Sequence, residues 1–91
     1  MDIGFVWDET KYKKVLKKHG VKFYEVVSAF DDPNAVETWE QVGYEERWVW
    51  IGRTPSDRLL VVIYTDEDLP LKRIVTAFDA KGRWENEYYG R

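Results

Sequence analysis

The chain has 91 residues, of which 44% are hydrophobic and 34% are charged, and its formal net charge is −3. This composition excludes a disordered tail and favours one folded domain spanning residues 1–91. With no cysteine, the chain cannot form a disulfide framework or a thiolate metal site. We find no membrane span and no signal peptide, so we expect a cytoplasmic protein, and the acidic balance is not typical of a nucleic-acid binder.

Two helices are predicted in the N-terminal third. Asp8 is placed to cap a helix from Glu9 to about Lys18, which Gly20 ends. Its buried stripe is predicted to be Tyr12, Val15 and Leu16. A second helix is expected over Tyr24–Phe30, followed by a stop at Asp31-Asp32-Pro33-Asn34.

The apolar run Leu59–Thr65 (LLVVIYT) has the pattern of a central strand buried on both faces. Short connections to Arg47–Gly52 and Leu71–Phe78 predict an antiparallel meander. Ala35–Trp39 is expected to be a further strand at the edge, and Ala80–Tyr89 a short closing helix. The expected fold is therefore α+β, with two N-terminal helices and an antiparallel sheet of about four strands.

Few side chains are candidates for catalysis or for binding a ligand. His19 is the only histidine, and a lone histidine at a helix C-terminus is more often structural than catalytic. Glu46, Arg47 and Arg73 form either ion pairs at the sheet rim or a phosphate site in which the arginines bind and the glutamate moves a proton.

The aromatic residues Trp48, Trp50 and Tyr64 follow the strands of the predicted meander. Such a stripe can stack RNA bases if it is exposed, but core packing is the expected role of at least two of the three. The acidic run Asp66-Glu67-Asp68 is expected to be a solvated hairpin tip and not a metal site. No fingerprint for a phosphate loop, a catalytic triad or a dinucleotide is present, so we expect no cofactor.

Taken together, the chain resembles the BrnT family, the toxins of type II toxin-antitoxin pairs. The motifs that carry this resemblance are Phe5-x-Trp7-Asp8 with Lys11, Lys18-His19-Gly20-Val21 with Phe23 and Glu25, Phe30-x-Asp32-Pro33 with Glu46-Arg47, and Arg73-Ile74-Val75-Thr76-Ala77. The resemblance implies a fold similar to the RelE-like ribonuclease toxins and a metal-independent RNase that blocks translation. It also implies a hetero-oligomer with an antitoxin that carries a ribbon-helix-helix DNA-binding domain. The functional residues that it implies are Lys18, His19, Glu46, Arg47 and Arg73.

The chain also departs from the family pattern at several positions. Phe78 stands where the pattern has an arginine, Val15 where it has an asparagine, and Glu67 and Asp68 where it has a basic residue. These departures leave two alternatives open. The chain could be a weakened or inactive family member that binds an antitoxin as a partner or co-repressor, or an unrelated small α+β domain that binds a protein.

Overall fold

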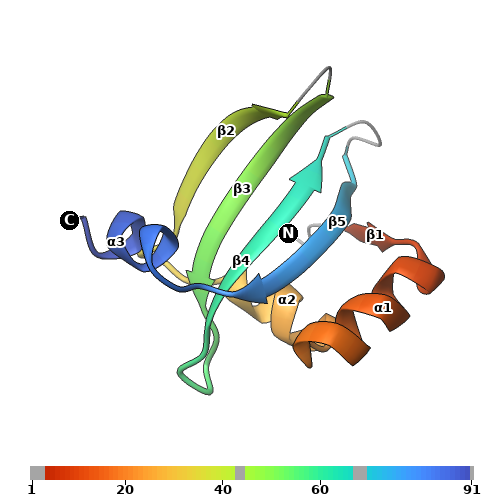
Figure 1. Cartoon of the computed structure of the whole chain (residues 1–91), viewed down its shortest axis with the longest axis horizontal. Helices are drawn as coiled ribbons and strands as arrows, with labels where there is room; N and C mark the ends of the chain where they lie inside the picture. Colours follow the sequence, from red (N-terminus) through yellow and green to blue (C-terminus); the bar gives the residue numbers. More distant parts are fainter. Residues whose placement is uncertain (1–3, 43–44, 67–69, 91) are drawn as a thin grey trace.

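The computed structural model describes residues 4–42, 45–66 and 70–90 and shows an α+β fold with a five-stranded mixed sheet, which confirms the predicted class (Figure 1). In chain order, the described elements are β1 (Phe5–Trp7), α1 (Glu9–His19), α2 (Phe23–Ala29), β2 (Val36–Val42), β3 (Glu45–Arg53), β4 (Leu59–Thr65), β5 (Lys72–Asp79) and α3 (Arg83–Tyr89). None of the described helices is long and apolar enough to cross a membrane.

The strand order across the sheet is β1-β5-β4-β3-β2, with β4 in the middle. Strands β3, β4 and β5 pair antiparallel in succession, so the predicted meander is confirmed. Strand β2 lies at one edge, as predicted, but continues to Val42 instead of ending at Trp39.

The prediction of about four antiparallel strands was wrong in one respect. Strand β1 pairs parallel with β5, and its register sets Phe5 opposite Lys72 and Trp7 opposite Ile74. A segment of three residues is too short to show an alternating pattern, and its partner lies far away in the sequence. The sheet is therefore mixed, while the likeness to RelE-like toxins remains a prediction.

Helix α1 begins and ends where the sequence predicts. The backbone N–H of Lys11 donates to Asp8 Oδ1 at 3.0 Å, and Gly20 ends the helix with a left-handed φ of 65°. Of the predicted stripe, Val15 is buried, whereas Leu16 is 38% exposed. The predicted burial of Leu16 was wrong because α1 lies beside β5 at the margin of the sheet (Figure 1), where only a narrow strip of the helix meets the core.

Helix α2 packs on one face of the sheet, which we call the α2 face. Val21, Val26, Leu60 and Val62 are fully buried there in the main core cluster. The Trp50 indole N–H donates to the Ala29 carbonyl at 2.9 Å. This close approach requires a glycine on β3, because a Cβ at Gly52 would lie 2.3 Å from the same carbonyl oxygen.

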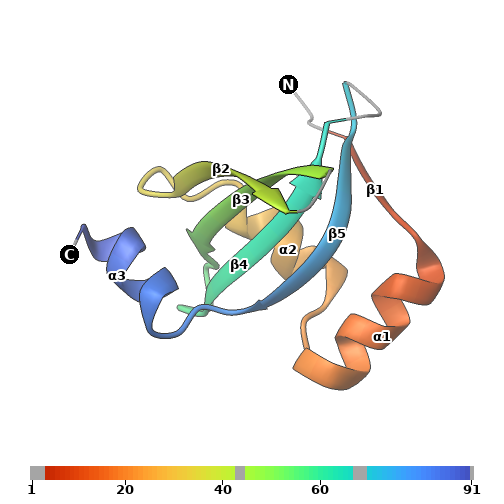
Figure 2. The ribbon, with the colours of Figure 1, turned by 45° about the horizontal axis from the view of Figure 1, so that its top comes forward.

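The opposite face of the sheet, the α3 face, carries a smaller core cluster centred on Val49 and Val61. Trp84 of α3 packs against this cluster. Helix α3 begins at Arg83, later than the predicted Ala80, because Gly82 adopts a positive φ of 58° before it. In two views, α3 lies at one end of the molecule and α1 at the other (Figures 1 and 2), so most of the α3 face lies between them.

Candidate functional site

The strand register brings two predicted arginines onto one face. Trp48 lies opposite Tyr64, and Thr65 lies opposite Arg73. Because successive side chains alternate between the faces of a strand, Arg47, Thr65 and Arg73 share the α3 face in one row across three strands. Arg47 and Arg73 are separated by two strand spacings, about 10 Å at the backbone, which two arginine side chains can bridge to a shared anion.

Glu46 does not join this row. It precedes Arg47 on the same strand, and its side chain is exposed on the α2 face. The residue beside Arg47 on the α3 face is instead Glu40 of β2, which forms an ion pair with Arg83 of α3. The expected convergence of a glutamate from position 46 with the two arginines is therefore wrong, since adjacent residues on a strand point in opposite directions.

Helix α1 adds further cations at the edge of β5. Lys14, Lys18 and His19 line a hollow of about 250 Å³ together with Val15 and Thr76. Thr76 lies opposite Ile63 and follows Arg73 by three residues, with a bulge between them. Thr76, the β5 residue of this hollow, thus lies about 10 Å along the strand from Arg73.

Phe78 is located between α1 and α3 on the α3 face. Its ring centroid lies 5.9 Å from that of His19 and 6.3 Å from that of Trp84. The side chain is half-buried and packs against the smaller core cluster. A ring therefore occupies the region where the family pattern leads us to expect an arginine.

Arg58 connects the site to the rest of the fold, and the sequence reasoning missed it. Its guanidinium binds both carboxylate oxygens of Asp79, at 2.7 and 3.1 Å, and both of Glu25, at 3.2 and 3.1 Å. It also donates to the carbonyls of His19 and Gly20, each at 3.0 Å, and so holds the end of α1 against β5. These partners lie between 21 and 39 residues away in sequence, so no local pattern indicates the cluster.

The charges of this cluster stabilise one another. The hydrogen bonds from Arg58 lower the pKa of Asp79, although burial opposes that shift. The same bonds raise the pKa of Arg58 above its ordinary value, again against burial. Arg58 and Asp79 are therefore ionised near neutral pH, and the bonds from Arg58 to the His19 and Gly20 carbonyls fix the end of α1.

The aromatic stripe faces the other way. Tyr64 is only 2% exposed, and the Trp50 indole is bonded under α2, so these two rings pack the core as expected. A base cannot stack on the buried Tyr64 ring, so the predicted RNA contact there is contradicted. Trp50 is half-buried and its ring stacks on Phe30 at 4.7 Å between centroids, and the RNA contact at this position stays a prediction. Trp48 is half-buried on the same α2 face, away from the arginine row.

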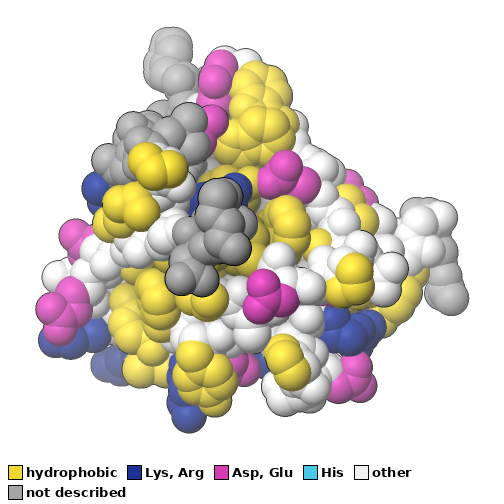
Figure 3. Space-filling model, turned by 180° about the vertical axis from the view of Figure 1, so that it is seen from behind, with side chains coloured by type: hydrophobic (Ala, Val, Ile, Leu, Met, Phe, Trp, Pro, Cys, Tyr) yellow, Lys and Arg dark blue, Asp and Glu magenta, His cyan; other side chains and the backbone are white. Residues whose placement is uncertain are grey.

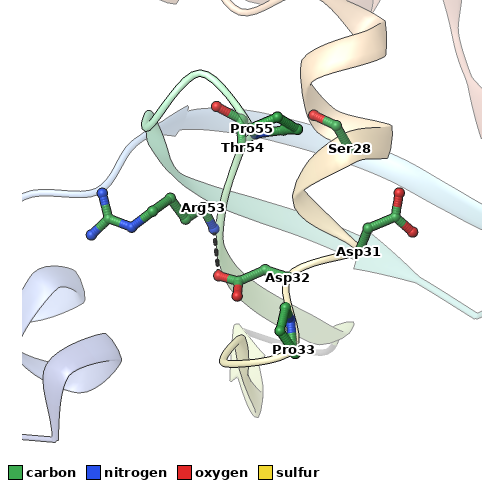
Figure 4. Close-up of a pocket in the computed structure, with 7 residues that line it drawn as sticks. All are labelled: Ser28, Asp31, Asp32, Pro33, Arg53, Thr54 and Pro55. Carbon is green, nitrogen blue, oxygen red and sulfur yellow. Dashed lines mark hydrogen bonds between the residues drawn. The ribbon is translucent and has the colours of Figure 1, made fainter.

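Another hollow, of about 230 Å³, lies between the end of α2 and the loop after β3 (Figure 4). Its wall includes Asp31 and Asp32, and the side chain of Arg53 leads away from it. Burial raises the pKa of Asp32, but hydrogen bonds from the Tyr88 hydroxyl and from two backbone N–H groups outweigh it, so the pKa lies below its ordinary value. Asp32 is thus a structural acceptor, and the acidic wall is unsuited to an anion.

Of the predicted acidic hairpin tip, the structure describes only Asp66. Glu67 and Asp68 lie outside the described residues, as does the family departure at Glu67. Within the described ranges, no group of three or more His, Asp or Glu side chains is placed to hold a metal ion.

The structure is a small α+β domain whose mixed sheet carries Arg47 and Arg73 on one face. The family model described as "Ribonuclease toxin, BrnT, of type II toxin-antitoxin system" matches residues 7–83. The chain therefore belongs to the BrnT family of toxins, as the sequence motifs predict, and this membership implies a cognate antitoxin partner.

One solved structure supports the fold. The crystal structure of the Brucella abortus ribonuclease toxin, BrnT, is similar with a TM-score of 0.64 and 17% sequence identity. The likeness covers 89% of this chain and 100% of that one. No curated protein matches the chain.

Proposed function

We propose that this chain is a toxin that cleaves single-stranded RNA on its α3 face and so blocks translation. The observation that carries the proposal is the register that sets Arg47 and Arg73 in one row, beside a helix end bearing Lys18 and His19. Guanidinium pairs bind phosphate through bidentate hydrogen bonds, and this face holds two of them within reach of one strand of RNA.

In the proposed reaction, the ribose 2′-hydroxyl attacks the adjacent phosphorus. His19 accepts the hydroxyl proton as the new P–O bond forms, and the Lys18 ammonium donates a proton to the 5′-oxygen as the old P–O bond breaks. Arg47 and Arg73 stabilise the negative charge that develops on the phosphoryl oxygens, a role that contributes about 10²- to 10³-fold in rate for comparable donors. Glu46 is not required, because it lies on the other face.

Cleavage of a single-stranded RNA of mixed sequence by the purified chain tests the proposal. We expect Arg73→Ala and Lys18→Ala to slow cleavage by about 10²-fold or more. Lys13→Ala is the matched control, because Lys13 lies on the same helix in an exposed pair with Glu9 at 3.5 Å. Equal rates for the wild-type chain, Arg73→Ala and Lys18→Ala would refute the proposed site.

A second candidate role follows from Phe78. Its ring fills part of the α3 face, which favours a family member with weakened catalysis that acts chiefly by binding an antitoxin. The same assay separates the two roles, since this weakened or inactive alternative predicts little or no cleavage by a folded wild-type chain and little or no growth defect on its expression.

The partner in either role is proposed to be an antitoxin with a ribbon-helix-helix domain, as the family resemblance implies. This assignment is supported by membership of a type II toxin family and not by any contact in the structure. Co-purification with the product of the neighbouring short gene, followed by binding to its own promoter DNA, is the corresponding test.

A further inference from the structure

Trp39 is an exposed tryptophan at the edge of the sheet. It lies on β2, directly opposite Trp48 of β3, and 47% of its surface is exposed to solvent. Alternation places both rings on the α2 face, beyond the part that α2 covers. Viewed from behind, hydrophobic side chains gather at the top of this face, with acidic side chains beside them (Figure 3).

Carboxylates surround this tryptophan pair. Glu37 and Glu46 lie on the same face of β2 and β3, and the Trp48 indole N–H donates to Asp66 at 3.4 Å. Glu46 and Asp66 are exposed, and Glu37 accepts a hydrogen bond from Tyr64. We define the acidic tryptophan patch as Glu37, Trp39, Glu46, Trp48 and Asp66.

The same aromatic stripe already binds one ammonium group inside the protein. Lys72 lies 4.3 Å from the centre of the Tyr64 ring, with its Nζ 3.2 Å from the Tyr64 hydroxyl. Among the described residues, the cation–aromatic contacts go to other rings and not to Trp39 or Trp48. The patch therefore offers tryptophan, the ring that binds cations most strongly through cation–π interactions, with carboxylates nearby. No described cation lies over the ring of Trp39 or Trp48.

We infer that the acidic tryptophan patch is the docking site for a cationic segment of the cognate antitoxin, in which an arginine or lysine lies over Trp39. Charge complementarity selects this occupant, because carboxylates attract a basic peptide and repel the phosphates of RNA. A large exposed tryptophan is also the residue type that most often carries binding energy at protein interfaces. The inference rests on family membership, which implies an antitoxin, and not on the proposed cleavage reaction.

The patch and the arginine row lie on opposite faces of one sheet. Antitoxin affinity and RNA cleavage can therefore be measured as separate properties of the same variants. A change in the patch should alter the first and leave the second as in the parent chain.

Affinity for the purified cognate antitoxin, measured by titration calorimetry, tests the inference. We expect Trp39→Ala to weaken binding at least about 10-fold, which is about 1.4 kcal/mol. Glu46→Lys should also weaken binding, and its effect should shrink as salt is raised. Tyr24→Ala is the matched control, because Tyr24 is an aromatic residue on α2 that is 67% exposed and lies outside the patch.

Circular dichroism first confirms that each variant is folded, which is expected because the substituted side chains are exposed. Wild-type affinity in both folded patch variants would overturn the inference. So would a loss of single-stranded RNA affinity in Trp39→Ala with unchanged antitoxin affinity, because that result would assign the patch to RNA.

Discussion

Two buried threonines show how the hydrogen bonding of one hydroxyl group decides whether its removal stabilises or destabilises the fold. Thr54 and Thr65 are each 4% exposed. The Thr54 hydroxyl accepts from the Arg58 backbone N–H at 3.1 Å and lies 2.9 Å from the Ser56 hydroxyl, whereas the Thr65 hydroxyl has no hydrogen-bond partner in the described structure. A buried polar group without a partner destabilises the folded state, and one with partners does not.

We therefore expect Thr65→Val to leave the free energy of unfolding unchanged or to raise it by up to about 1 kcal/mol. Thr54→Val should lower it by about 1 to 2 kcal/mol, because its partners would lose their bonds. Urea denaturation of the two variants beside the parent measures both changes. A Thr65→Val variant that is destabilised as much as Thr54→Val would show that the Thr65 hydroxyl has a partner in solution.

Part of the site could be predicted residue by residue. Arg47 and Arg73 are expected to converge, and the register places both on one face. This expectation holds because the order of the meander strands can be predicted from the sequence. Glu46 does not join them, because successive side chains of a strand point to opposite faces, and residues 46 and 47 therefore lie on different faces of the sheet. Trp39 was missed because exposure at a sheet edge depends on where α2 ends above the sheet, which a strand pattern does not encode.

At the scale of the elements, Arg58 joins α1, α2 and β5 at one point. Its ion pair with Asp79 is only partly sheltered, since the Asp79 side chain is 42% exposed, while that of Glu25 is 12% exposed. The lowered pKa of Asp79 means that the folded state favours its charged form. This contribution to stability is present above the ordinary pKa of 3.8 and is lost as the pH falls through the lower pKa of the folded state.

Asp79→Asn should therefore be less stable than the parent at pH 7, and the difference should narrow as the pH falls toward 3. Asp57→Asn is the matched control, because Asp57 forms an exposed pair with Arg53 and is 83% exposed at its side chain. Urea midpoints at several pH values measure the effect. A stability difference between parent and Asp79→Asn that stays constant from pH 7 to pH 3 would contradict the assigned ion pair.

For the whole molecule, the fold was predictable wherever contacts are local. Capped helices, the central strand and the meander follow from neighbouring residues, such as Asp8 before α1 and the apolar run of β4. Strand β1 and the Arg58 cluster depend on partners from distant segments of the chain, so no local sequence pattern predicts either of them. The result is a sheet with two different faces, one with a cationic row and one with an acidic tryptophan patch.

The central claim is that RNA lies along the α3 face on Arg47 and Arg73. Its most direct test is the salt dependence of single-stranded RNA affinity for the parent and for an Arg47→Ala/Arg73→Ala variant. If each arginine neutralises one phosphate, the slope of log affinity against log salt should fall by about 1.4 in the variant, or about 0.7 per contact. A folded variant with the parent's slope and affinity would contradict the account.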